Sequence, residues 1–154
     1  MRSNVTLPTH AVNKILPYTC EQLFDLVADI ERYPEFLSGW VEARIIEQTG
    51  NHLRVRQRLG LPLLPQSFIS TAELERPSQL SIRSNDGPFR NLQINWQFQP
   101  VEVERCEVEL EVNLALKSRI LNQLAGAFHD TAARDILTRF ESRAHALYGA
   151  QKNT

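Results

Sequence analysis

The chain has 154 residues, of which 42% are hydrophobic and 23% charged, and its formal net charge is −1. This length suits one domain, residues 1–154, around one core. A net charge near zero excludes a general attraction to nucleic acid or to an anionic membrane. No apolar run reaches the roughly 18 residues of a membrane-spanning helix, and residues 1–10 lack the apolar core of a secretion signal. We therefore expect a cytoplasmic protein with no DNA partner, which could contact the inner membrane only from its surface.

Motifs for catalysis or metal binding are missing from the sequence. The two cysteines, Cys20 and Cys106, are too few for a disulfide framework, and we expect two reduced structural thiols in a reducing compartment. None of the four histidines stands in a nucleophile, zinc or triad motif, and the six glycines form no phosphate-binding loop. The sequence therefore predicts no catalytic residue, no metal ligand and no cofactor.

The first 40 residues predict a strand, a capped helix and an aromatic loop. Thr19 and Gln22 have the spacing of a capping box, and the helix that follows must end before Pro34. The segment YPEFLSGW combines aromatic residues with proline and glycine, which indicates a helical turn and a loop that packs large side chains. The expected elements are a loose tail at 1–8, a strand at 10–16, a helix from residue 20, and the turn and loop at 33–40.

After Gly39 the apolar residues alternate with polar ones, which is the period of a β-strand. The segment GLPLLPQ interrupts this pattern, and its two prolines predict a loop at 60–66. Each strand offers one apolar and one polar face, so helices should cover one side of an antiparallel α+β meander. The expected strands span residues 41–48, 52–59, 67–75, 80–84, 92–98 and 106–114.

One long helix is predicted at residues 117–148, with a loose tail after residue 149. Its apolar residues form two stripes on different faces. We expect the second half to pack on the sheet around Phe140, and the first half to cover a gap or to kink near Gly126. The first stripe holds Ile120, Leu121, Leu124, Ala127 and Phe128, and the second holds Ile136, Phe140, Ala144 and Leu147.

Large apolar side chains stand in loops beside prolines and glycines, notably in residues 60–66. Such side chains need an apolar partner, which could be the core, the mouth of a pocket under the long helix, or a lipid or protein surface. The pocket is the favoured interpretation, and ligand pockets commonly measure about 300–1,000 Å³. Two charged rows are interpreted as solvated strand faces, one of Arg54, Arg56 and Arg58, extended by Arg44, and one of Glu107, Glu109 and Glu111.

Four segments resemble one family, the START-like proteins of polyketide-cyclase type, and within it the coenzyme-Q-binding group that includes ribosome association toxins. The resemblance implies a helix-grip fold, in which a curved antiparallel sheet of six or seven strands surrounds a long C-terminal helix and an apolar cavity. It also implies binding of ubiquinone or a related isoprenoid lipid in support of respiratory electron transfer. The matching segments are LPYTCEQLFDLVADIERYPEFL at 16–37, VEAR at 41–44, NDGPFRNLQINWQF at 85–98 and RFESRAHALYG at 139–149.

The chain departs from this family after the YPEFL motif. Members usually carry Pro-Trp-Cys there, whereas this chain has Ser38, Gly39 and Trp40. We hypothesise that the flexible pair makes the loop a gate, which would fail if Gly39→Pro left ligand exchange unchanged. Phe89 is considered as a plug, and Arg90 as a head-group contact or an anchor of its turn. The candidate ligand-binding residues are Phe36, Trp40, Leu61, Leu63, Phe68, Phe89, Arg90, Trp96, Leu121, Leu124 and Phe128.

Three functions follow as expectations. The leading one is a non-enzymatic carrier of a quinone-like lipid, because an isoprenoid tail binds through buried area and needs few polar contacts. The second is a protein that binds ribosomal subunits and blocks their association, although the basic residues are dispersed. The third is a polyketide cyclase or aromatase, which would need placed acids or bases that the sequence does not show.

Overall fold

The computed structural model describes residues 10–60 and 67–149, and within them it leaves the side chains of His10 and of residues 124–130 undescribed. The elements follow the predicted order. They are β1 His10–Leu16, α1 Cys20–Ala28, the 3-10 helix η1 Ile30–Glu35, β2 Trp40–Thr49, β3 His52–Leu59, β4 Ser67–Glu75, β5 Gln79–Ser84, β6 Phe89–Glu102, β7 Arg105–Leu116 and α2 Arg119–Tyr148.

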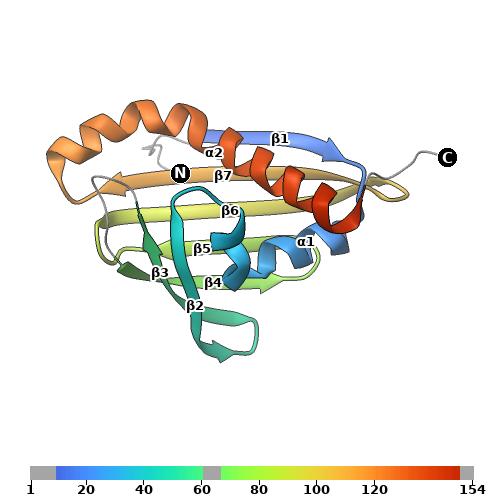
Figure 1. Cartoon of the computed structure of the whole chain (residues 1–154), viewed down its shortest axis with the longest axis horizontal. Coiled ribbons are helices and arrows are strands. Elements are labelled where there is room, and N and C mark those ends of the chain that lie inside the picture. Colours follow the sequence, from blue (N-terminus) through green and yellow to red (C-terminus); the bar gives the residue numbers. More distant parts are fainter. Residues whose placement is uncertain (1–9, 61–66, 150–154) are drawn as a thin grey trace, which may run out of the picture.

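Seven antiparallel strands form one curved sheet, in the order β1-β7-β6-β5-β4-β3-β2. Strands β2 to β7 form a meander, and the last strand, β7, also pairs with the first, β1. In this pair His10 lies opposite Val112 and Leu16 opposite Cys106. Figure 1 shows α2 and the two short helices on the same side of this sheet. The predicted α+β class and the helix-grip arrangement are therefore confirmed.

The alternation along each strand decides which residues face the helices. In β3 the residues Leu53, Val55, Gln57 and Leu59 are buried, whereas the three arginines between them are exposed. Strand β6 extends further than predicted, because its pairing with β7 continues past Pro100 to Glu102. The apolar rows of all strands thus meet on the concave side of the sheet.

The first helix ends before Pro34. Thr19 caps α1 through the predicted capping box, in which its hydroxyl accepts from the Gln22 backbone N–H and its own N–H donates to the Gln22 side chain. The helix ends at Ala28, because Asp29 adopts a non-helical ψ of 66°. The chain then turns into η1, which accommodates Pro34. The predicted end before Pro34 is therefore confirmed, and the helical turn begins earlier than the predicted residue 33.

Helix α2 has 30 residues and begins at Ser118, whose hydroxyl accepts from the Leu121 N–H. Figure 1 shows it as an arch across the sheet rather than a straight rod. Phe140 is 4% exposed and lies at the centre of the packed half, as predicted. The prediction that the stripes are packed is wrong for two of their members, since Ile120 is 71% exposed and Leu147 is 53% exposed. Leu147 faces solvent although the neighbouring Tyr148 packs against Tyr18, with ring centroids 5.9 Å apart.

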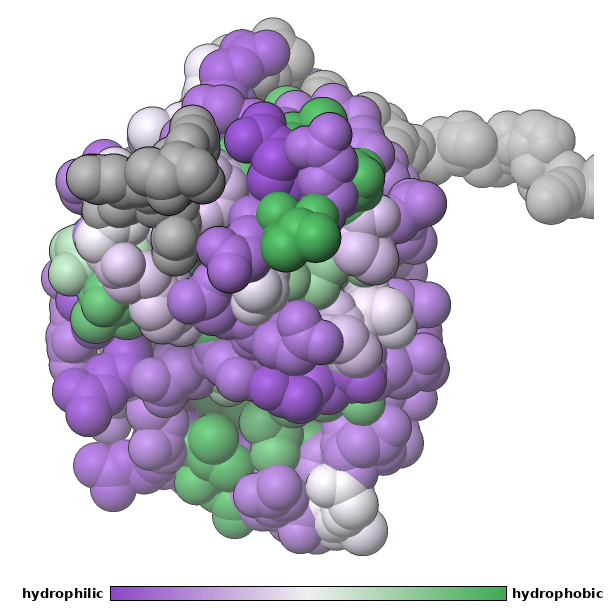
Figure 2. Space-filling view, turned by 90° about the vertical axis from the view of Figure 1, so that its right-hand side faces the viewer, coloured by the Kyte–Doolittle hydropathy of each residue, from purple (hydrophilic) through white to green (hydrophobic). Residues whose placement is uncertain are grey.

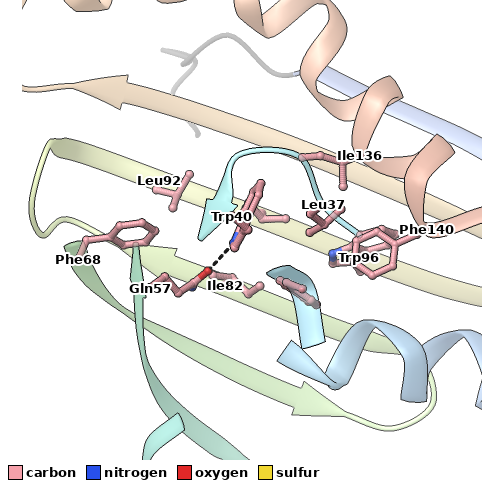
Figure 3. A pocket seen from close by; sticks show the side chains of 11 residues that line it. Leu37, Trp40, Gln57, Phe68, Ile82, Leu92, Trp96, Ile136 and Phe140 are labelled. Atoms are coloured by element: carbon pink, nitrogen blue, oxygen red, sulfur yellow. Dashed lines mark hydrogen bonds between the residues drawn. The ribbon is translucent and has the colours of Figure 1, made fainter. Parts of the chain in front are cut away.

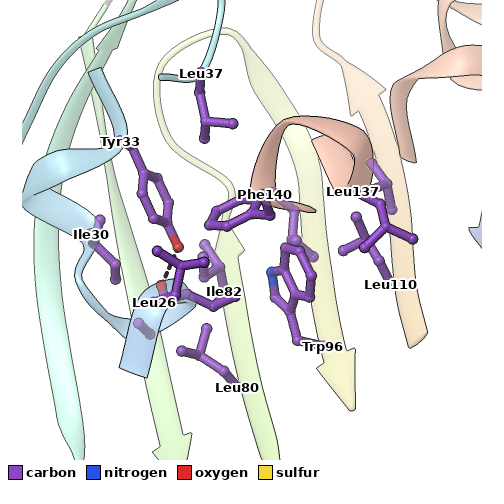
Figure 4. Packing of buried hydrophobic residues seen from close by; sticks show 14 of the residues in the cluster. Leu26, Ile30, Tyr33, Leu37, Leu80, Ile82, Trp96, Leu110, Leu137 and Phe140 are labelled. Carbon is purple, nitrogen blue, oxygen red and sulfur yellow. Dashed lines mark hydrogen bonds between the residues drawn. The ribbon is translucent and has the colours of Figure 1, made fainter. Parts of the chain in front are cut away.

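Aromatic rings hold the packed half of α2 against the sheet and η1. The Phe140 ring lies 4.9 Å from Trp96, 5.4 Å from Tyr33 and 5.0 Å from Phe36, in each case edge to face. Edge-to-face pairs at these distances are favourable beyond the area they bury. Figure 4 shows Phe140 between Tyr33 and Trp96, with Leu137 beyond Trp96 and close to Leu110. This cluster joins three elements and forms one wall of the site described next.

Candidate functional site

A small cavity lies where η1, the start of β2, the sheet and α2 meet (Figure 3). Its walls are aliphatic and aromatic side chains, with one amide among them. The described residues that line it are Tyr33, Leu37, Trp40, Gln57, Phe68, Ile82, Leu92, Ile94, Trp96, Ile136 and Phe140. Its position under α2 agrees with the predicted pocket between the closing helix and the strands.

The cavity is much smaller than the sequence analysis expects. Its free volume is about 20 Å³, which is the space of about one water molecule. A typical ligand pocket measures about 300–1,000 Å³. The expectation of a hollow interior is therefore wrong for this conformation, because Trp40, Phe68, Trp96 and Phe140 project into the space. A large ligand could enter only if these side chains moved apart.

A chain of hydrogen bonds crosses this apolar cavity. The Trp40 indole N–H donates to Oε1 of Gln57 over 2.8 Å, and Nε2 of Gln57 donates to the Ser70 hydroxyl over 2.8 Å. Gln57 is 3% exposed and Ser70 is 1% exposed. Buried polar groups are costly unless they are paired, so these three residues fix one another in place. Figure 3 shows Trp40 and Gln57 meeting between Phe68 and Trp96.

Tyr33 closes the η1 side of the cavity. Its hydroxyl donates to the Val27 carbonyl, which ties η1 to the end of α1. Burial raises the pKa of Tyr33 above its ordinary value, with a smaller contribution from the charge of Asp29. The neutral phenol is thus held as a structural donor. Tyr33 is the single ionisable side chain among the described residues that line the cavity.

A charged contact fastens η1 to α2 at the outer rim. Nη2 of Arg143 lies 2.6 Å from Oε1 of Glu35, and the guanidinium lies 4.9 Å above the Phe36 ring. Hydrogen bonds from Arg32 and from Arg143 lower the pKa of Glu35. The pair therefore keeps its charge at neutral pH and holds η1 over the packed half of α2.

The turn before β2 depends on glycine. Gly39 has φ of 89°, a region that favours glycine and that proline cannot reach because its ring fixes φ near −65°. Its carbonyl accepts from the Gly60 N–H over 2.8 Å, which joins the turn to the end of β3. Gly39→Pro would disrupt the turn itself, so Gly39→Ala is the better test of the predicted gate.

The structure brings together some of the predicted ligand-binding residues. Trp40, Phe68 and Trp96 line the cavity. Phe36 is half-buried at the rim, and Phe89 packs behind Phe68 with ring centroids 4.8 Å apart. Four more of these residues, Leu61, Leu63, Leu124 and Phe128, lie outside the described residues or side chains.

Two other predicted residues lie apart from the cavity. Arg90 is exposed, on the face of β6 opposite to the buried Phe89. Leu121 is half-buried and packs against the core near the start of α2, but it does not line the cavity. The interpretation of Arg90 as a head-group contact therefore has no support from its position.

Sequence reasoning missed most of the lining, including Leu37, Ile82, Leu92 and Ile136. Ile82 and Leu92 look like ordinary core positions in the alternating pattern, and Ile136 belongs to the helical stripe predicted to pack on the sheet, so no local signal marks these three as cavity lining. Leu37 stands in the aromatic loop at 33–40, which was predicted to pack large side chains. Gln57 had a signal, because it is the polar member of an otherwise apolar inward row in β3. A polar residue in such a row indicates either a buried network or a ligand contact.

The two cysteines lie outside the cavity. Cys20 at the start of α1 and Cys106 in β7 are buried free thiols whose sulfur atoms are 2.6 Å apart. Burial raises the pKa of both thiols, so they are protonated at neutral pH. Over the residues that the structure describes, no cluster of three or more histidine, cysteine or carboxylate side chains could hold a metal ion.

No helix in the described part of the chain is both long and apolar enough to cross a membrane. Figure 2 views the end of the molecule at the right of Figure 1 and shows a largely hydrophilic surface with separate hydrophobic patches. Val103, in the turn between β6 and β7, is 87% exposed.

The outer face of the sheet carries basic residues at its β2–β3 edge. Arg44 and Arg56 lie directly opposite each other in the β2–β3 pair, and Arg83 lies opposite Thr71, two strands further along. Arg54 pairs with Glu47 at 3.1 Å. The acidic row of β7 lies on the same outer face, near the opposite edge of the sheet. The two rows that were predicted as solvated faces thus give this face a basic and an acidic side.

Comparisons with known proteins place the chain among relatives of two kinds. It is 33% identical to the ribosome association toxin RatA of Rickettsia prowazekii over 135 residues, covering 85% of this chain and 92% of that protein. It is 24% identical to the mitochondrial coenzyme Q-binding protein COQ10 homolog B of Xenopus laevis over 147 residues, covering 93% of this chain and 60% of that protein.

Solved structures share the fold. The solution structure of an 18 kDa protein from Caulobacter crescentus has a TM-score of 0.73 and 31% identity, and the match covers 94% of this chain and all of that one. A START superfamily protein from Mycobacterium smegmatis has a TM-score of 0.70 and 14% identity, with coverage of 90% and 98%. The family described as polyketide cyclase/dehydrase and lipid transport matches residues 16–141, and the chain belongs to it.

Proposed function

We propose that the chain binds a hydrophobic isoprenoid lipid, ubiquinone in the first place, between α2 and the sheet, and carries it without converting it, in support of respiratory electron transfer. The observation that carries this proposal is the apolar, aromatic cavity under α2. Membership of a lipid transport family and the likeness to a coenzyme Q-binding protein support it. The working place would be the cytoplasm, with transient contact to the surface of the inner membrane.

Binding by this mechanism requires the cavity to widen. The flexible boundary would be the turn at Gly39 and the α2 side chain Ile136, which is half-buried over the cavity. Each CH₂ group that leaves water contributes about 0.8 kcal/mol, so one isoprenoid unit of five carbons could offset a modest rearrangement. The ligand would then take the place of contacts that the lining side chains make with one another.

A direct titration tests the proposal. Ubiquinone with two isoprenoid units is titrated into the protein by calorimetry, and saturable binding with a negative heat-capacity change is expected, because apolar surface becomes buried. Leu92→Phe should block binding by filling the cavity, whereas Gln97→Phe, at an exposed position of the same strand, should leave it unchanged. Equal binding by both variants would contradict a site in this cavity.

An enzymatic role in cyclisation is the weaker alternative, although the family description includes cyclases. Such a reaction needs acids or bases placed over the substrate. Among the described lining residues the ionisable side chain is Tyr33, and its hydroxyl already donates to Val27. We therefore propose a non-enzymatic role with no cofactor besides the bound lipid. A bell-shaped pH–rate profile on a linear polyketide would overturn this choice.

A second candidate function is binding to ribosomal subunits, which the name of the Rickettsia relative suggests. The observation in its favour is the arginine pair Arg44 and Arg56 on the outer face, where like charges directly opposite each other weaken the sheet unless an anion compensates them. Co-sedimentation with ribosomal subunits should then fall steeply as salt rises. No co-sedimentation at low salt would remove this candidate.

A further inference from the structure

Gln57 stands out among the residues that line the cavity. It occupies the inward row of β3 with Leu53, Val55 and Leu59, where an aliphatic side chain would complete the core without a polar group. Gln57 is polar and yet buried, with 3% of its surface exposed. Two further polar partners, Trp40 and Ser70, are present around it. A buried network of this kind is expected to have a specific role, because an apolar residue would fill the same space at lower cost.

The orientation of the Gln57 amide follows from its partners. The Trp40 indole N–H is a donor only, so the atom of Gln57 that faces it must be the carbonyl oxygen. The NH₂ group therefore points toward Ser70. One of its two hydrogens is used by the Ser70 hydroxyl, and the second N–H has no partner among the described residues. What Gln57 still offers is a hydrogen-bond donor.

A second free donor lies in the wall of the same cavity. Trp96 is 3% exposed and lines the cavity, and its indole N–H has no hydrogen-bond partner among the described residues. Figure 3 shows the Trp96 and Gln57 side chains on opposite sides of Leu37 and Trp40, around the same space. The remaining polar group of the lining, the Tyr33 hydroxyl, already donates to the Val27 carbonyl. The free N–H groups of the wall are thus those of Gln57 and Trp96.

We propose that the Gln57 amide and the Trp96 indole form a head-group subsite that donates hydrogen bonds to carbonyl oxygens of a flat ring. The inference rests on the proposed lipid-binding function and specifies which chemistry the site selects. A ring with carbonyl acceptors, such as a benzoquinone, satisfies both donors and packs between Trp40, Phe68 and Phe140. A hydrocarbon of the same size leaves both donors unpaired.

The test compares two ligands that share a tail. One is ubiquinone with two isoprenoid units, and the other is a benzene ring that carries the same two-unit tail and no oxygen. Both are titrated by calorimetry into the wild-type chain and into Trp96→Phe, Gln57→Leu and Gln97→Leu. Trp96→Phe keeps an aromatic ring but removes the indole N–H together with the five-membered ring, so its effect is read from the ratio of the affinities for the two ligands. Gln97→Leu is the exposed control on the same strand as Trp96.

Trp96→Phe and Gln57→Leu should each weaken quinone binding about three- to tenfold, which is the range of one hydrogen bond. Binding of the prenylated benzene should stay the same or improve, and Gln97→Leu should change neither ligand. If the wild type binds both ligands and Trp96→Phe does not alter their ratio, the subsite is refuted while the lipid-binding proposal stands. If the wild type binds neither ligand, the lipid-binding proposal itself fails. Circular dichroism identifies any variant that does not fold. If Gln57→Leu does not fold, Trp96→Phe decides the result, and if Trp96→Phe does not fold, Gln57→Leu decides it.

Discussion

At the α1 end of the concave face, Phe24, Val27 and Leu137 fill the space against Phe98, whereas at the β3 end the Trp40 indole meets the Gln57 amide beside a cavity. The gap at the α1 end has a free volume of about 10 Å³ and no polar side chain in its described lining other than the Trp96 indole. The cavity at the β3 end is about twice as large.

Trp96 and Phe140 line both spaces and mark the boundary between them. One face of one sheet is therefore filled as core at one end and lines a cavity with a buried amide at the other. The difference arises from what faces the sheet there. The α1 end is covered by α1 and α2, and the β3 end by η1, the turn at Gly39 and the side of α2 at Ile136.

Truncating Phe140, which lies at the boundary between the two ends, should produce the largest change in stability. Phe140→Ala deletes a ring that contacts Tyr33, Phe36 and Trp96, and the free energy of unfolding should fall by about 3–5 kcal/mol. Urea denaturation measures this loss. Leu147→Ala on the same helix is the control, because Leu147 is 53% exposed and should cost less than about 0.5 kcal/mol. Equal losses would show that Phe140 is not central to packing.

As pH rises, the first loss of stability should come from the α1 end, because the ordinary pKa of a thiol lies below that of the buried Tyr33 phenol. Burial raises the pKa of Cys20 and Cys106 above 9.0, the ordinary value for the thiol. The folded state holds these protons more tightly than the unfolded chain, so stability is full below pH 9 and falls above it. Each thiol contributes a slope of roughly 1.4 kcal/mol per pH unit.

Cys106→Ala should make the pH dependence shallower between pH 9 and 10 in urea unfolding experiments. Gln57→Leu, which changes the other end, should leave the slope as it is in the wild type. An unchanged slope in Cys106→Ala would mean that other groups, such as surface lysines, cause the alkaline loss of stability.

A substitution in the turn at Gly39 should change stability less, and it also tests the proposed gate. Gly39→Ala forces a side chain into a positive φ of 89°, which should lower the free energy of unfolding by about 1–2 kcal/mol. If the turn is the gate, the exchange rate of bound quinone, measured by stopped-flow transfer to lipid vesicles, should also change. Gly50→Ala, in a β2–β3 turn at a φ of 60°, imposes a similar strain and should leave exchange unaltered.

The smallest effect is expected on the outer face of the same end. Arg44→Thr removes one of two arginines that lie directly opposite each other, so stability should rise by about 0.2–1 kcal/mol at low salt. The gain should shrink in high salt, because ions screen the repulsion between exposed charges. A loss of stability, independent of salt, would show that Arg44 packs favourably on its neighbours.

Much of the fold was predictable because its signals are local. Thr19 and Gln22 show a capping box, and the alternation of β3 separates its buried row from its arginines. The break at Asp29 was not predictable, since nothing in the sequence there forbids a longer helix. The exposure of Leu147 depends on which side of α2 faces the core near its end, where Tyr148 packs inward instead, and this is a property of the whole fold.

The site was predictable only in part. Trp40, Phe68 and Trp96 are large aromatic residues in or beside loops and family-like segments, which drew attention to them. Leu92 and Ile136 line the cavity because of how β6 and α2 cross, and no local pattern encodes that crossing. The size of the cavity was not predictable, because it depends on the rotamers of aromatic side chains in three different elements.

The central claim is that the β3 end of the concave face holds an isoprenoid lipid. The most direct measurement is organic extraction of the purified protein followed by mass spectrometry of the extract, with the Leu92→Phe variant purified in parallel. The account predicts a prenylated quinone in stoichiometric amount with the wild type and far less with the variant. A wild-type extract with no more isoprenoid lipid than that of the filled-cavity variant would contradict it.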